Sequence, residues 1–145
     1  MTKQILVGGV PIGGGAPVSI QSMLNTKTTD VDGSLRQLRE LADAGCQIAR
    51  LAVPDMDAAR GFAEIASASP LPLVADIHFD YRLAIAAAEG GAAKIRINPG
   101  NIGGEERVRV VVDACREKKI PIRIGVNGGS LDKRLLDKYG HPTPQ

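Results

Sequence analysis

Residues 94–104 read KIRINPGNIGG, and the interpretation of the whole chain starts from this stretch. Lys94, Arg96 and Asn98 alternate with two isoleucines, and this period of two predicts a strand with one polar and one aliphatic face. The Pro-Gly pair that follows predicts a turn where the strand ends. A solvent-exposed strand would show the same alternation, so the interpretation depends on whether other strands repeat it.

The chain repeats a strand followed by a helix on both sides of this stretch. Most of the expected helices start after an aspartate and end at a glycine or before a proline, which are common helix boundaries. The glycine-rich residues 5–15 come first and predict a small β-hairpin. The expected strands are residues 18–23, 47–53, 71–78, 94–98 and 121–127, and the expected helices begin near Asp30 or Asp32, Asp55, Asp80 and Gly104.

This alternation predicts an α/β fold with a parallel sheet and right-handed crossovers. An open doubly wound sheet and a (β/α)8 barrel both fit the order of elements. The GxGxxG fingerprint of dinucleotide-binding sheets is absent after the first strand, which weakens the first option. A complete barrel takes about 250 residues. The chain of 145 residues therefore predicts a partial (β/α)8 TIM barrel, about five βα units after an N-terminal β-hairpin.

Polar side chains recur late in the expected strands, next to apolar neighbours of opposite parity. The carboxyl ends of parallel strands meet at one end of the fold, where α/β proteins bind their ligands. We therefore expect a polar pocket at the mouth of the barrel. Lys94 comes earlier in its strand and is expected lower in the barrel, bridging to a carboxylate. The residues expected in the pocket are Arg50, Asp76, His78, Arg96, Asn98, Arg123 and Asn127.

Three of these side chains are arginines, which indicates an anionic ligand. Guanidinium groups bind phosphate oxygens in pairs and stay charged when partly buried, so three of them in one concave site favour a diphosphate. Asp76 can orient an arginine, and Asn98 and Asn127 can hydrogen-bond to hydroxyl or phosphate oxygens. A structural salt bridge explains any single arginine equally well. His78 either orients the site or is a structural histidine.

The charge and hydropathy of the chain argue against nucleic acids and membranes as partners. The net charge is only +2, without a basic run or an aromatic stacking platform, so no nucleic-acid partner is expected. No apolar run reaches the ~20 residues that span a bilayer, and the N-terminus lacks a signal-peptide core. A cytoplasmic protein away from membranes is therefore expected. Cys46 and Cys115 form no CxxC motif, so we expect two buried thiols and no metal site in this chain.

Five segments together resemble one enzyme family, the 4-hydroxy-3-methylbut-2-enyl diphosphate synthases of the methylerythritol phosphate pathway. The segments are residues 18–23, 50–54, 74–79, 94–103 and 122–131. The resemblance implies a (β/α)8 barrel that binds 2-C-methyl-D-erythritol 2,4-cyclodiphosphate. It also implies a two-electron reductive ring opening and dehydration, giving the linear allylic diphosphate of isoprenoid biosynthesis. Arg50, Arg96 and Arg123 match positions that hold the diphosphate, and Asp76, Asn98 and Asn127 match other pocket positions.

The resemblance also implies parts that we expect to be absent from this chain. In the family, a [4Fe-4S] cluster held by three cysteines and a glutamate lies in a C-terminal domain. That domain closes over the barrel of the partner subunit in a homodimer, and flavodoxin or ferredoxin supplies electrons. Neither Cys46 nor Cys115 matches a cluster ligand. We therefore expect residues 1–145 to be the N-terminal part of a substrate-binding barrel, without the iron–sulfur domain and inactive alone.

Two other functions stay open on the sequence. One is a non-catalytic half-barrel that binds phosphorylated ligands. The other is a barrel like that of dihydropteroate synthase, which also binds a diphosphate-bearing substrate. The unpaired edges of the first and fifth strands further predict poor folding of this segment by itself.

Overall fold

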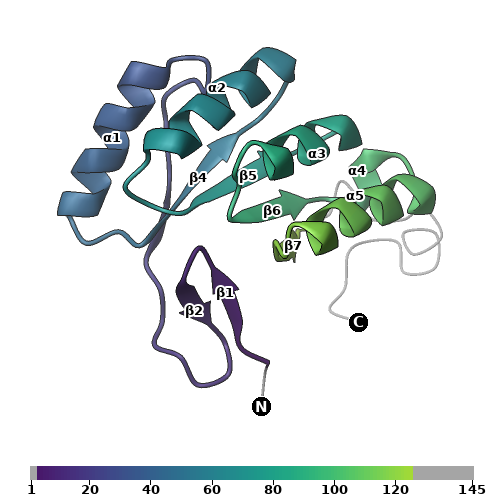
Figure 1. Cartoon of the computed structure of the whole chain (residues 1–145), viewed down its shortest axis with the longest axis horizontal. Coiled ribbons are helices and arrows are strands. Elements are labelled where there is room, and N and C mark those ends of the chain that lie inside the picture. The colour runs from purple at the N-terminus through teal and green to yellow at the C-terminus, as the bar shows by residue number, and fades with distance from the viewer. Residues whose placement is uncertain (1–2, 126–145) are drawn as a thin grey trace, which may run out of the picture.

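The computed structural model describes residues 3–125 of the protein. A parallel sheet, whose strands pair in chain order, carries helices on one face (Figure 1). An antiparallel hairpin of β1 (Ile5–Val7) and β2 (Val10–Ile12) precedes it. The strands of the sheet are β3 (Gln21–Met23), β4 (Ile48–Ala52), β5 (Leu73–Ile77), β6 (Lys94–Ile97) and β7 (Ile122–Ile124). The helices are α1 (Val31–Asp43), α2 (Met56–Ala68), α3 (Tyr81–Glu89), α4 (Pro99–Ile102) and α5 (Glu105–Glu117).

Three aspartates begin α1, α2 and α3, as the sequence predicts. The carboxylates of Asp30, Asp55 and Asp80 each accept a hydrogen bond from a backbone N–H of the first turn. Each bond satisfies a donor that has no partner within the helix. Arg82 donates to both oxygens of Asp80, over 3.1 and 2.9 Å, and these hydrogen bonds hold the pKa of that carboxyl below its usual value.

Alternation along each strand divides the sheet into an aliphatic face and a polar face. Ile95 and Ile97 of β6 are fully buried in the core that also contains Phe62 of α2. Lys94 and Arg96, of opposite parity, line a cavity on the other face. Burying one isoleucine contributes about 1.5–3 kcal/mol, and a slip of one residue would move both isoleucines to the polar face. The aliphatic face therefore determines which side chains the polar face presents.

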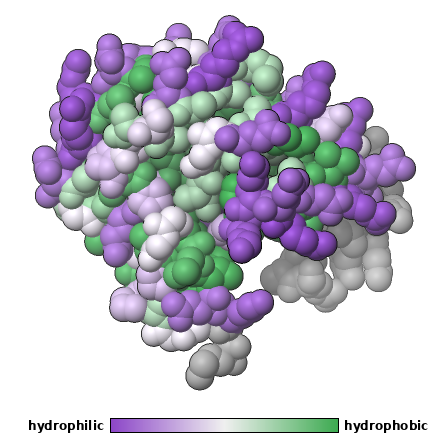
Figure 2. Space-filling model, in the orientation of Figure 1, coloured by the Kyte–Doolittle hydropathy of each residue, from purple (hydrophilic) through white to green (hydrophobic). Residues whose placement is uncertain are grey.

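The β1–β2 hairpin covers the lower end of the polar face. Val7 is fully buried in a small cluster with Ile48 of β4 and Val74 of β5. The hairpin turn brings Gly8 against Pro72, just before β5, so closely that a Cβ at Gly8 would collide with the proline ring. These contacts lie at the amino-terminal ends of the strands, opposite the end where such folds bind ligands. Away from these contacts the hairpin exposes apolar surface, seen as a green patch low in Figure 2.

Two predicted elements need correction. Residues after β6 were expected to form a simple turn but form the short helix α4. Asn98 caps it by accepting a hydrogen bond from the Gly100 N–H at 3.0 Å, and Pro99 suits the first helical position because it lacks an N–H. The first strand is shorter than expected, since its pairing starts where Gln21 meets Ile48, the first residue of β4. The predicted end of the fifth strand, residues 126–127, lies outside the described residues.

The described part of the chain agrees with the predicted partial barrel. It has five parallel strands in chain order with the helices on one face, which is the arrangement of βα units in a (β/α)8 barrel. Within residues 3–125, β3 and β7 each pair with one strand only. No helix in that range is long and apolar enough to cross a membrane.

Gly61 allows a first prediction, about stability. Gly61 lies within α2, where alanine normally stabilises by about 0.5–1 kcal/mol. Here a Cβ would collide with the backbone carbonyl oxygen of Thr28, in the segment between β3 and α1. We therefore expect Gly61→Ala to lower the free energy of unfolding by about 1–3 kcal/mol in urea denaturation. The exposed Ser67→Ala in the same helix should change it by less than about 0.5 kcal/mol; equal effects would contradict the prediction.

Candidate functional site

Asp76 of β5 is the carboxylate on which the polar face converges. Its side chain is 3% exposed. Arg96, its neighbour on β6, donates from Nη1 to Asp76 Oδ1 over 3.0 Å. Arg50 Nε and His78 Nε2 each lie 3.6 Å from the other oxygen, Oδ2. Side chains from β4, β6 and the residue after β5 are thus brought around one buried negative charge.

Arg50 keeps a donor available in this arrangement. Its Nη2 lies 3.3 Å from the thioether sulfur of Met23, which is a weak acceptor. Its Nε is buried and faces Asp76 Oδ2 at 3.6 Å, a distance longer than a hydrogen bond. The side chain as a whole is 32% exposed and lines the cavity on the polar face. Its guanidinium group can therefore also contact an anionic ligand, which fits the predicted phosphate chemistry.

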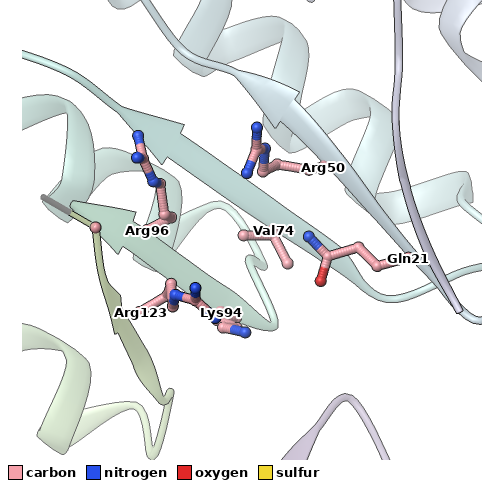
Figure 3. A pocket seen from close by; sticks show the side chains of 7 residues that line it. Gln21, Arg50, Val74, Lys94, Arg96 and Arg123 are labelled. Carbon is pink, nitrogen blue, oxygen red and sulfur yellow. The ribbon is translucent and has the colours of Figure 1, made fainter. Parts of the chain in front are cut away.

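A cavity of about 240 Å³ opens beside these groups on the polar face (Figure 3). Four of its lining side chains are cationic and one is an amide, and no carboxylate is among the described residues that line it. The excess of positive charge favours a small anion over a neutral ligand. The lining residues are Gln21, Arg50, Val74, Lys94, Arg96, Arg123 and Gly125.

Lys94 is placed differently from the prediction in one respect. The register pairs Lys94 with Val74, and Arg96 with Asp76, so Lys94 does lie lower on the sheet. The expected bridge to a carboxylate is not found among residues 3–125, because the ion pairs of Asp76 are made with Arg50, Arg96 and His78. Lys94 instead lines the cavity and is only 8% exposed. Burial, together with the nearby charge of Arg123, lowers the pKa of its ammonium group.

The other predicted site residues lie in different places. His78 follows β5 and is 46% exposed, with its ring 6.1 Å from that of Phe79. Asn98 is 3% exposed and uses its side-chain oxygen to cap α4. Neither side chain lines the cavity that the described residues form. Asn127 lies outside the described residues.

Gly125 is a site residue that sequence reasoning missed. It follows β7 and lines the cavity, and a Cβ there would lie 2.7 Å from Nε of Arg96. Its backbone N–H donates to the carbonyl of Ile97 over 2.9 Å, which keeps it beside β6. A glycine at the end of a strand is the only signal in the sequence, and many glycines give that signal without touching a ligand site.

The described residues do not fit the iron–sulfur cluster that the resemblance implies. No group of three His, Cys, Asp or Glu side chains within residues 3–125 is arranged to hold a metal ion. Cys46 is buried, with its thiol 3.1 Å from the carbonyl oxygen of Ile48. Cys115 is buried in the core of α5, where burial raises the pKa of its thiol. Both cysteines are therefore buried, as predicted.

Comparison with known protein families supports the barrel-like arrangement of strands and helices. The sequence model of the GcpE TIM-barrel domain matches residues 2–145. The chain belongs to this family. It is 59% identical over 143 residues to the "4-hydroxy-3-methylbut-2-en-1-yl diphosphate synthase (flavodoxin)" of Marinomonas sp. (strain MWYL1), and 60% identical over 144 residues to the protein of that name from Shewanella amazonensis. Each match covers 99% of this chain but 39% of the relative, so the chain spans well under half of their length.

A solved structure shares the fold of this GcpE-family chain. Dihydropteroate synthase from Xanthomonas albilineans, in complex with 7,8-dihydropteroate, aligns with a TM-score of 0.66 over 94% of this chain and 54% of that chain. The sequence identity is 17%, so the likeness concerns the fold alone. The family match confirms the predicted resemblance and, with the five-stranded sheet, the predicted TIM-barrel portion.

A second prediction concerns the buried carboxylate of Asp76. Asp76→Asn keeps the size of the side chain but leaves Arg96 and Arg50 without their negative partner. We expect a loss of about 3 kcal/mol in the free energy of unfolding, measured in urea, because breaking a buried ion pair strands the remaining charges. The matched control is Asp57→Asn, which breaks an exposed pair with Arg60 and should cost less than about 1 kcal/mol. Equal losses in the free energy of unfolding would contradict the prediction that the buried ion pairs of Asp76 stabilise the fold more than the exposed pair does.

A third prediction concerns Gly125. Gly125→Ala should push the Arg96 guanidinium from its position and weaken the binding of pyrophosphate by about tenfold, the cost of one hydrogen bond to a charged group. Calorimetric titration measures this change. In an Arg96→Met background, Gly125→Ala should have little further effect, since the two changes act on the same contact. Full additivity of the two losses would contradict this role of Gly125.

Proposed function

We propose that this chain is the diphosphate-binding part of an enzyme that opens the ring of 2-C-methyl-D-erythritol 2,4-cyclodiphosphate. The product would be 4-hydroxy-3-methylbut-2-enyl diphosphate, for isoprenoid biosynthesis. The observation that carries the proposal is the cationic cavity, whose described lining has four cationic side chains and no carboxylate. The names of the relatives support it, since both are diphosphate synthases.

In this proposal the described residues bind and orient the substrate. Arg96 and Arg50 hold phosphoryl oxygens, and Asp76 fixes the direction of both guanidinium groups. Arg123 adds a cation from β7. His78 and Asn98 are proposed as further pocket residues from their positions directly after β5 and β6. Asn127 is proposed as a further pocket residue on the resemblance alone.

The reaction also needs two electrons, which we assign to parts of the protein other than residues 3–125. The relatives carry the word flavodoxin in their names, and we propose flavodoxin as the donor. A [4Fe-4S] cluster would supply the redox chemistry, held by a separate domain in a homodimer, because the described residues offer no ligand set for it. This chain is accordingly expected to bind the substrate without turning it over.

A fourth prediction tests the proposed substrate. The chain should bind the cyclodiphosphate in a calorimetric titration, and Arg50→Met should weaken binding by about tenfold or more through the loss of charged hydrogen bonds. Arg36→Met removes an exposed arginine of α1 and serves as the matched control, with no change expected. Preference for a pterin diphosphate over the cyclodiphosphate would overturn the proposal. Equal losses in the two variants would show that the cavity is not the binding site.

A further inference from the structure

The four cations of the cavity form two pairs at different heights on the sheet. Arg50 starts low, level with Val74, but reaches up to within 3.6 Å of Asp76, where Arg96 also binds. Arg123 starts level with Arg96, yet its charge acts on Lys94, which lies lower. Figure 3 shows Arg50 and Arg96 above, with Arg123 and Lys94 together below.

The upper pair has its counter-charge within the protein. Asp76 lies at 3.0 Å from Arg96 and at 3.6 Å from Arg50, and it is buried between them. One carboxylate thus offsets part of the charge of two guanidinium groups. The upper pair can therefore remain in place in the empty site.

The lower pair has no such partner among residues 3–125. The described ion pairs at this face are those of Asp76 with Arg50, Arg96 and His78, and none involves Lys94. Lys94 is nevertheless only 8% exposed, and it lines the cavity together with Val74 and Gln21. A cation withdrawn from water beside a second cation is unfavourable unless an anion neutralises it.

A purely structural lysine would look different. Lysine in a structural role normally extends its ammonium group to water or pairs it with a carboxylate. Lys94 instead lines the polar cavity together with Arg123. A buried cation that has no ion pair within residues 3–125 and lies in the wall of a polar cavity is a candidate ligand-binding residue.

We propose that Lys94 is an anion-binding residue of this site and that, with Arg123, it holds one phosphoryl group of a ligand whose other phosphoryl group lies against Arg50 and Arg96. The proposal deepens the proposed function and rests on it. The two phosphoryl groups are those of the diphosphate named in the proposed function, and the new assignment is that of Lys94. Lys94 lies early in β6 and forms no ion pair within residues 3–125, so neither feature identifies it as a binding residue.

The test is the binding of pyrophosphate to the wild-type chain and its variants by calorimetry. Lys94→Met should weaken binding by about tenfold or more, as expected for a lost hydrogen bond between charged groups. Lys118→Met removes an exposed lysine after α5 and should leave the affinity unchanged. Lys94→Gln also removes the charge but keeps a polar side chain. If one of the two variants fails to fold, the other still tests the role of Lys94 in binding.

A second measurement follows Lys94 directly in the wild-type protein. The 13C resonance of its Cε, assigned by its loss in Lys94→Met, reports the pKa of the ammonium group during a pH titration. The charges facing it from β4, β6 and β7 are those of Arg50, Arg96 and Arg123. Bound pyrophosphate should raise the pKa of Lys94, because a neighbouring anion stabilises the charged form.

The outcomes separate the two proposals. Wild-type binding that is unchanged in both Lys94 variants, or a pKa of Lys94 that pyrophosphate does not move, would overturn the role of Lys94 and leave the diphosphate site intact. No binding of pyrophosphate by a wild-type chain that circular dichroism shows to be folded would overturn both. Weaker binding in the Lys94 variants, with Lys118→Met unaffected and the pKa raised, supports the two-pair arrangement.

Discussion

The contact between Asp76 and Arg96 is the constraint on which the polar face depends. It joins β5 to β6 over 3.0 Å at a position where the carboxylate is almost entirely buried. Removing a charge from water is costly unless it is paired or hydrogen-bonded. Asp76 therefore requires partners around it, and Arg50 Nε and His78 Nε2 each lie 3.6 Å from its second oxygen. The same requirement fixes two guanidinium groups at the mouth of a cavity. The ion pairs that Asp76 needs therefore also place two guanidinium groups in the wall of the cationic cavity.

Much of this site follows from the sequence because strand alternation is strict. A buried aliphatic face on β6 forces Lys94 and Arg96 to the opposite face, and the parallel register then places Asp76 beside Arg96. The capping aspartates likewise follow from their position before each helix. The helix caps depend on local sequence, and the facing of the strand side chains depends on the period of two. Both can be read from a single sequence.

Other features depend on how far and in which direction a side chain extends, which periodicity does not encode. Arg50 reaches up from its own level to Asp76, whereas the charge of Arg123 acts downward on Lys94. The expected carboxylate partner of Lys94 is therefore absent from the described residues. The need for a glycine at position 125 arises only once the Arg96 guanidinium has been placed.

The strands that carry the site also explain how ligand binding and folding are linked. The cavity takes side chains from β3, β4, β5, β6 and from β7 with the residue after it, and β3 and β7 each have one neighbouring strand in the described sheet. An anion that contacts Arg50, Arg96 and Arg123 bridges β4, β6 and β7, so it connects an edge strand to the interior. Because such a ligand binds only the folded arrangement, it stabilises that state by mass action, by about 2.7 kcal/mol at a hundredfold excess over Kd. The cations that line the cavity are thus the groups through which such a ligand would hold these strands together.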